Sequence, residues 1–174
     1  CGRKNLRFVD TQECDLSKPY FILRHDVDFC PESALKMAKI ENKIGIKATY
    51  FLLLDSPYYN LLSLDYIRIP KMLIDLGHEV GLHYDVETME NCLTTFSPAE
   101  LIKQYSTQLT MLMNQKVQSI AIHNPSSLQN QDPFLGLDYI YAYDPLFIQK
   151  SMYLSDSCGA WRDSAVDILE KEQI

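Results

Sequence analysis

Strand-like apolar runs alternate with helical segments along most of this chain. The strand-like runs are rich in β-branched and aromatic residues and comprise residues 20–26, 46–54, 78–85 and 117–126. The helical segments that separate them comprise residues 31–45, 64–77 and 97–115. Such alternation is typical of βαβ units, in which a helix connects two neighbouring parallel strands. The sequence therefore predicts a single α/β domain over residues 1–174.

Capping residues mark the ends of the predicted helices. Pro31 and Glu32 suit the first turn of the first helix, which Gly45 closes. Ser97, followed three residues later by Glu100, has the pattern of a capping box at the start of the third helix. The helical periods are therefore supported by independent signals at their ends.

Composition excludes several classes of protein. The net charge of −7 argues against nucleic acid as a partner, because phosphate binding requires a basic surface. No run approaches the roughly 18 to 20 apolar residues that a membrane span needs. The five cysteines are odd in number and form no CxxC pair, which indicates free thiols in a reducing compartment. We therefore expect a cytoplasmic protein.

Two carboxylates, Asp26 and Asp28, end the first predicted strand in the segment "ILRHDVDF". Side chains two residues apart on a strand point to the same face, so these acids repel unless a cation or a proton lies between them. His83 and His123 end two later strands. Because the carboxyl ends of parallel strands meet at one edge, we expect these four side chains to gather there.

Carboxylate and imidazole together form a ligand set suited to zinc. A zinc-bound water has a pKa near 7 and acts as a nucleophile, and a second carboxylate can take its proton. Asp26 and Asp28 are therefore expected to have different roles, one as a metal ligand and the other as a base. His25 alternates away from both acids and His78 begins its strand, so we expect both to be structural.

Other enzymes also use a D-x-D motif. A phosphatase of the haloacid dehalogenase type would carry a small pair after the second aspartate, where Phe29 and Cys30 stand here. A nucleotide-sugar glycosyltransferase with this motif would leave the strand "GLHYD" at 81–85 without a function.

Three segments, "ILRHDVD", "IGIKATYFLLL" and "LIDLGHEVGLHYD", resemble in order and spacing the NodB-type polysaccharide deacetylases of carbohydrate esterase family 4. More narrowly, they are similar to the WbmS-like branch. The resemblance implies a distorted (β/α) barrel of about seven strands with a divalent metal, usually zinc. It also implies hydrolysis of an N- or O-acetyl group on a sugar, with a carbohydrate or nucleotide-sugar substrate from surface-polysaccharide biosynthesis.

The resemblance also suggests individual roles. Asp26 matches the catalytic base, and Asp28 and His83 match metal ligands. Asp156, Trp161 and Arg162 resemble later elements that orient the base and line the substrate pocket. Asn124 lies in the segment "HNP", which takes the place of the family's arginine-proline segment, and Tyr84 is an aromatic residue that can stack on a sugar ring. Of these we expect Asp156 and Arg162 to act in catalysis, and Tyr84, Asn124 and Trp161 to bind substrate.

Two departures from the family pattern bear on function. Glu87 stands where the family's second metal-binding histidine is expected. Either Glu87 supplies an oxygen, or His123 becomes the third ligand, or the site binds metal weakly, and we favour His123. No histidine follows His123 to match the family's terminal catalytic acid. We therefore expect a chain truncated at its C-terminus; a natural end at Ile174 would lower the rate by ~10²- to 10⁴-fold.

The alternatives are a catalytically silent glycan-binding or scaffold relative and another hydrolase of carbon–nitrogen bonds. Glu87 and the missing terminal histidine both favour the silent relative.

Overall fold

The structure is a computed structural model that describes residues 4–54, 56–85, 96–123, 137–148 and 154–155. The chain divides into two compact units, residues 1–142 and 143–174. The second unit contains the short helix α5 (Pro145–Ile148). The expectation of one domain over residues 1–174 stays a prediction.

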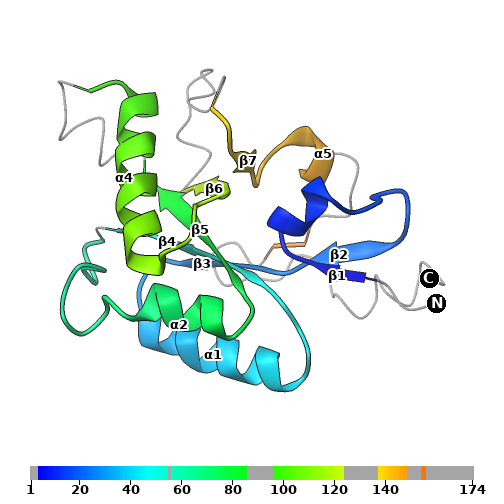
Figure 1. Ribbon diagram of the computed structural model, residues 1–174, viewed down its shortest axis with the longest axis horizontal. Helices are drawn as coiled ribbons and strands as arrows, with labels where there is room; N and C mark the ends of the chain where they lie inside the picture. The colour runs from blue at the N-terminus through cyan, green and yellow to red at the C-terminus, as the bar shows by residue number, and fades with distance from the viewer. Residues whose placement is uncertain (1–3, 55, 86–95, 124–136, 149–153, 156–174) are drawn as a thin grey trace. The chain divides into compact units, whose positions relative to one another are not determined.

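A five-stranded parallel sheet forms the centre of the first unit (Figure 1). Its strands, in spatial order, are β3 (Arg24–Val27), β4 (Thr49–Leu52), β5 (Glu79–Tyr84), β6 (Ser119–Ile122) and β7 (Ile140–Tyr141). Spatial order equals chain order, and each neighbouring pair is parallel. The predicted α/β fold with parallel strands is therefore confirmed. The pairings among the described strands run from β3 to β7 without closing, so the barrel stays a prediction.

The N-terminal segment adds elements that the sequence did not predict. Strands β1 (Lys4–Leu6) and β2 (Tyr20–Ile22) form a separate parallel pair, and η1 (Val9–Gln12) is a short 3₁₀ helix. The predicted strand at 20–26 is divided between β2 and β3. Its break lies at Leu23, whose carbonyl accepts from the Thr49 amide at 2.9 Å.

Three helices connect the strands of the sheet. They are α1 (Pro31–Lys43), α2 (Ile69–Asp75) and α4 (Pro98–Met113). The capping box at Ser97 and Glu100 is confirmed, and Gly77, after α2, has a φ of +86° that favours glycine. Helix α2 is shorter than predicted because Pro70, which would break a helix interior, lies in its first turn.

Strand register separates the sheet into two chemically different faces. On the helix face, Tyr50, Leu82 and Tyr84 lie towards the helices, and the Tyr50 hydroxyl donates to Glu41 of α1 at 2.6 Å. Helices α1, α2 and α4 group together in Figure 1, away from β1, β2 and η1. Most of this face is aliphatic or aromatic, so it forms the core beneath the helices.

The opposite face, which we call the site face, carries Asp26, Phe51, Gly81 and His83. Gly81 is required because a Cβ there would lie 2.4 Å from Phe51 Cε1. The ring of Phe8, in the segment before η1, packs against Phe51 with centroids 5.8 Å apart. The N-terminal segment therefore covers part of the site face.

Glu79 is a buried carboxylate at the start of β5, on the site face but at the end opposite His83. It accepts hydrogen bonds from the hydroxyls of Thr49 and Ser119, at 2.7 and 2.6 Å, and from the Val9 amide at 3.0 Å. Burial raises the pKa of Glu79 above its usual range, although these donors act to lower it. The carboxylate ties the N-terminal segment to the sheet.

The structure also bears on the expected free thiols and on the expected absence of a membrane span. Cys14 and Cys30, the cysteines whose surroundings are described, are free thiols. None of the helices described is both long enough and apolar enough to cross a membrane. The cytoplasmic location stays a prediction.

Candidate metal centre

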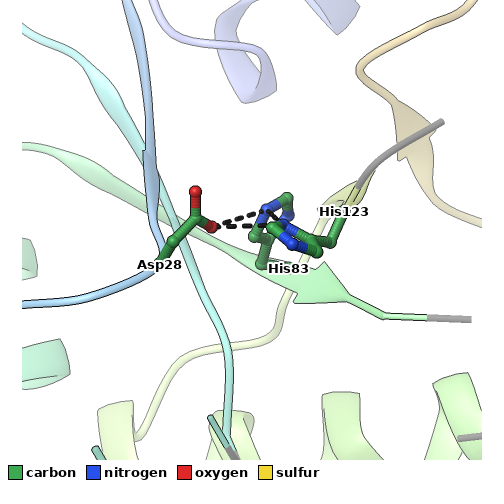
Figure 2. A group of neighbouring side chains, drawn as sticks. All are labelled: Asp28, His83 and His123. Atoms are coloured by element: carbon green, nitrogen blue, oxygen red, sulfur yellow. Dashed lines mark hydrogen bonds and ion pairs between the residues drawn. The ribbon is translucent and has the colours of Figure 1, made fainter. Parts of the chain in front are cut away.

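Asp28, His83 and His123 come together at the carboxyl ends of three strands (Figure 2). Asp28 follows β3, His83 lies near the end of β5, and His123 follows β6. Asp28 Oδ1 lies 3.3 Å from His83 Nε2 and 3.3 Å from His123 Nδ1. The two imidazole nitrogens are also 3.3 Å apart, so the three atoms form an equilateral triangle.

The backbone fixes which nitrogen His83 presents to this triangle. His83 is 2% exposed, and its Nδ1–H donates to the Ala121 carbonyl of β6 at 2.9 Å. A carbonyl can only accept, so Nδ1 carries a proton, and Nε2 is the ring nitrogen available to a metal ion. An imidazole oriented through its second nitrogen is the usual arrangement of a metal-binding histidine.

His123 is positioned by the same pair of strands. Its amide donates to the Tyr84 carbonyl at 2.7 Å, which extends the β5–β6 pairing by one residue. The rings of His123 and His83 are nearly perpendicular, with centroids 5.2 Å apart. The side chain of His123 is 37% exposed, whereas that of His83 is 1% exposed. The triangle therefore has one buried and one accessible imidazole.

Asp28 is the anionic member of the group. Its Oδ1 is buried, and apart from the imidazole nitrogens of His83 and His123 the described part of the chain supplies this atom with no hydrogen-bond partner. Burial acts to raise the pKa of Asp28, but His83 and then His123 outweigh it, so the pKa lies below its ordinary value. The imidazoles therefore hold the carboxylate ionised, and a cation bound between the three side chains would stabilise it further.

These residues fit a divalent metal on two observations. An ion with tetrahedral bonds of ~2.0–2.1 Å spaces its ligands ~3.3–3.4 Å apart, which matches the edges of the triangle. The buried Asp28 Oδ1 has only these two imidazole nitrogens as polar partners among the described residues, at distances longer than a good hydrogen bond, which is costly for a carboxylate oxygen. Two imidazoles with one carboxylate are a donor set that suits zinc and leaves a fourth position open.

Asp26 lies on the site face, two residues before Asp28, but does not join the triangle. Its carboxylate is held by Arg24 in a two-point ion pair, with Nη2–Oδ2 at 2.6 Å and Nε–Oδ1 at 3.1 Å. The Arg24 guanidinium also lies over the Phe51 ring, 5.7 Å from its centroid. Sequence reasoning missed this pair, although an arginine two residues before an aspartate on a strand is a usable signal.

Three further residues considered in the sequence, Tyr84, His25 and His78, lie away from the triangle. Tyr84 is 1% exposed on the helix face, so the structure does not bring its side chain to the triangle. His25 and His78 bond to Glu41 and to the Ala38 carbonyl, away from the triangle as expected. Five predicted residues lie outside the described part of the chain: Glu87, Asn124, Asp156, Trp161 and Arg162.

No family model and no curated protein matches this sequence. Among solved structures, the wild-type CE4 family pseudoenzyme from Bacillus anthracis is 24% identical, covering 69% of this chain and 41% of its own, with a TM-score of 0.49. A mutant of that pseudoenzyme is 24% identical, with a TM-score of 0.50 over 69% of this chain and 42% of its own.

The Xyl-CE4 domain of a multidomain xylanase, from the hindgut metagenome of Trinervitermes trinervoides, is 18% identical. The likeness covers 69% of this chain and 55% of that domain, with a TM-score of 0.50. This chain thus matches 41–55% of the length of these structures. At these identities the likeness concerns the fold, and the protein shares the α/β fold of CE4 structures.

Proposed function

We propose that this protein is a metal-dependent deacetylase that hydrolyses an acetyl group on a carbohydrate. The observation that carries the proposal is the triangle of Asp28 Oδ1, His83 Nε2 and His123 Nδ1, with edges of 3.3 Å. The shared fold with CE4 structures supports a carbohydrate substrate. The WbmS-like branch, an N- or O-acetyl group and a surface-polysaccharide precursor remain parts of this proposal.

The three residues of the triangle would hold the ion, with zinc the best fit to their donor atoms. When bound there, a divalent cation supplies Lewis-acid polarisation of a carbonyl and a water of lowered pKa. The lone pair of His83 is aimed by the Ala121 carbonyl, and Asp28 contributes the negative charge. His123, the more exposed ligand, borders the side from which substrate enters.

Asp26 is the proposed general base, and Arg24 is its positioning residue. The two-point ion pair fixes the plane of the Asp26 carboxylate, the group that would accept the proton. Asp156 and Arg162 remain proposed catalytic residues. Tyr84, Asn124 and Trp161 remain proposed substrate-binding residues, and Glu87 is the alternative third ligand.

A catalytically silent glycan-binding relative is the second candidate. One observation favours it: both carboxylate oxygens of Asp26 are bonded to Arg24, which competes with a proton for the same lone pairs. Such a protein would use the fold without turnover.

Acetate release separates the two candidates. The full-length protein is freed of metal, reloaded with zinc and offered N- and O-acetylated sugars and oligosaccharides. We expect zinc-dependent acetate release that Asp26→Asn reduces by ~10²-fold or more. His25→Asn, on the helix face, is the matched control and should retain activity. Zinc binding without acetate release across the panel would overturn the deacetylase and leave the silent relative.

A further inference from the structure

Two aromatic side chains, Phe29 and Tyr58, are exposed where the chain leaves β3 and β4. Phe29 directly follows the proposed ligand Asp28, and Tyr58 lies in the segment after β4. Phe29 is 63% exposed and Tyr58 is 64% exposed. Their rings contact each other edge to face, with centroids 4.6 Å apart. Large aromatic rings usually bury most of their surface, so two adjoining exposed rings form an apolar patch that indicates binding.

Hydrogen bonds tie this aromatic pair to the backbone that carries the proposed ligand. The Ser56 hydroxyl donates to the Asp28 carbonyl at 3.1 Å and accepts from the Tyr58 amide at 3.1 Å. Ser56 therefore connects Tyr58, which bears one ring, to Asp28, the residue before Phe29. The aromatic pair and Asp28 are held in a common frame.

Tyr59 also connects the segments that follow β3 and β4. Its hydroxyl donates to the Val27 carbonyl at 2.6 Å and accepts from the Leu53 amide at 3.1 Å. Tyr59 is 5% exposed, so these bonds are shielded from water. Tyr59 thus holds the segments after β3 and β4 together, while the neighbouring Tyr58 is exposed to solvent. Pre-organised exposed rings lose little conformational entropy when they bind a ligand.

We propose that Phe29 and Tyr58 form a stacking platform for a sugar ring next to the acetylated one, so that the substrate is an oligosaccharide or polysaccharide. This inference rests on the proposed function. The apolar C–H face of a pyranose packs on aromatic rings, while its hydroxyls remain in water. Phe29 is the next residue after the proposed ligand Asp28, so a sugar stacked on the platform would be a neighbour of the one whose acetyl group reaches the ion.

Charge favours a neutral glycan over a nucleotide sugar. Glu32, exposed in the first turn of α1, lies three residues after Phe29, and its carboxylate contacts Cys30 Sγ at 3.4 Å. The chain as a whole carries a net charge of −7. An uncharged oligosaccharide needs no positive charge beside this platform, whereas a diphosphate would depend on the proposed metal ion for neutralisation.

The test measures binding against glycan length. The zinc-loaded full-length protein is titrated calorimetrically with N-acetylated oligosaccharides of one to five sugars and with a nucleotide sugar. Phe29→Ala and Tyr58→Ala should each weaken binding of the longer oligosaccharides by ~10-fold, with the single sugar unaffected. Phe29→Tyr should bind as the natural protein does, because it keeps the ring. Phe21→Ala, on β2, is the matched control and should change nothing.

Zinc stoichiometry and acetate release keep the two proposals apart. The alanine variants should retain zinc and kcat while KM for long substrates rises. Loss of binding without any acetate release would support the platform and overturn the deacetylase. Unchanged binding of every oligosaccharide by both alanine variants would overturn the platform, as would equal losses for the single sugar or the nucleotide sugar.

Discussion

Replacement of Gly81 by alanine tests whether close packing on the site face positions His83. The new Cβ would lie 2.4 Å from Phe51 Cε1, 2.6 Å from Phe51 Cδ1 and 2.7 Å from Ser119 Oγ. Carbon atoms pack at ~3.5–4.0 Å, so the Phe51 ring must move by about 1 Å. That ring is fully buried and contacts both the Phe8 ring and the Arg24 guanidinium, so its movement disturbs both neighbours.

The expected cost follows from these contacts. Overpacking of a close-packed core costs ~1–3 kcal/mol. Alanine recovers ~0.5–1 kcal/mol relative to glycine, because glycine loses more backbone entropy in a strand. Three contacts below 3.0 Å place the overpacking cost in the upper part of its range, ~2–3 kcal/mol, so the free energy of unfolding should fall by ~1–2.5 kcal/mol. For a chain of this size that is a Tm decrease of ~2–10 °C. Strand β5 also carries His83, so its displacement should lower zinc affinity ~10-fold or more.

The assay pairs urea denaturation of the metal-free protein with zinc titration against a competing chelator. A second substitution, Phe51→Leu, removes the ring that the alanine would strike. The double variant should be more stable than the sum of the single changes predicts, by at least ~0.5 kcal/mol. Unchanged stability and zinc affinity of Gly81→Ala would refute the packing argument.

The remaining predictions use the same two assays. His123→Ala should lower zinc affinity by ~100-fold or more, because losing a ligand costs more than losing a residue that only hydrogen-bonds to a ligand. His25→Ala should leave zinc affinity unchanged. Equal zinc affinities of the natural protein and His123→Ala would show that His123 is not a ligand. Tyr59→Phe leaves a buried amide and carbonyl without their partner and should cost ~1–3 kcal/mol of unfolding free energy in urea, and a loss below ~0.5 kcal/mol would contradict this. Because the folded pKa of Glu79 is raised, its stabilising contribution is present below pH 4.5 and is lost as pH rises through the folded pKa. Glu79→Gln should therefore gain stability relative to the natural protein across that window in urea denaturation from pH 4 to 8, and a gain independent of pH would contradict the raised pKa.

Local sequence signals predicted much of the fold. The capping box at Ser97 and Glu100 is confirmed because both of its hydrogen bonds form within one turn. The apolar period that continues through residues 64–68 predicts an earlier start for α2 than the structure shows. Pro70 is tolerated in the first turn of a helix, and α2 accordingly begins at Ile69. Pairing of β1 with β2 depends on contacts between distant residues, which no short pattern encodes.

The candidate site was predictable to a similar extent. Asp28 and His123 each follow a strand and His83 lies near the end of one, and parallel strands bring such positions to one edge. The tautomer of His83 could not be predicted, because it depends on a backbone carbonyl of β6, which every residue type supplies alike. The exposure of Phe29 and Tyr58 and their contact could not be predicted either, because sequence does not distinguish an exposed ring from a buried one.

Anomalous diffraction at the zinc edge, from crystals of the zinc-loaded protein, tests the central claim most directly. The account predicts one strong peak ~2.0–2.2 Å from Asp28 Oδ1, His83 Nε2 and His123 Nδ1 together. A peak held by Glu87 in place of His123, or no peak beside Asp28 and His83, would contradict it.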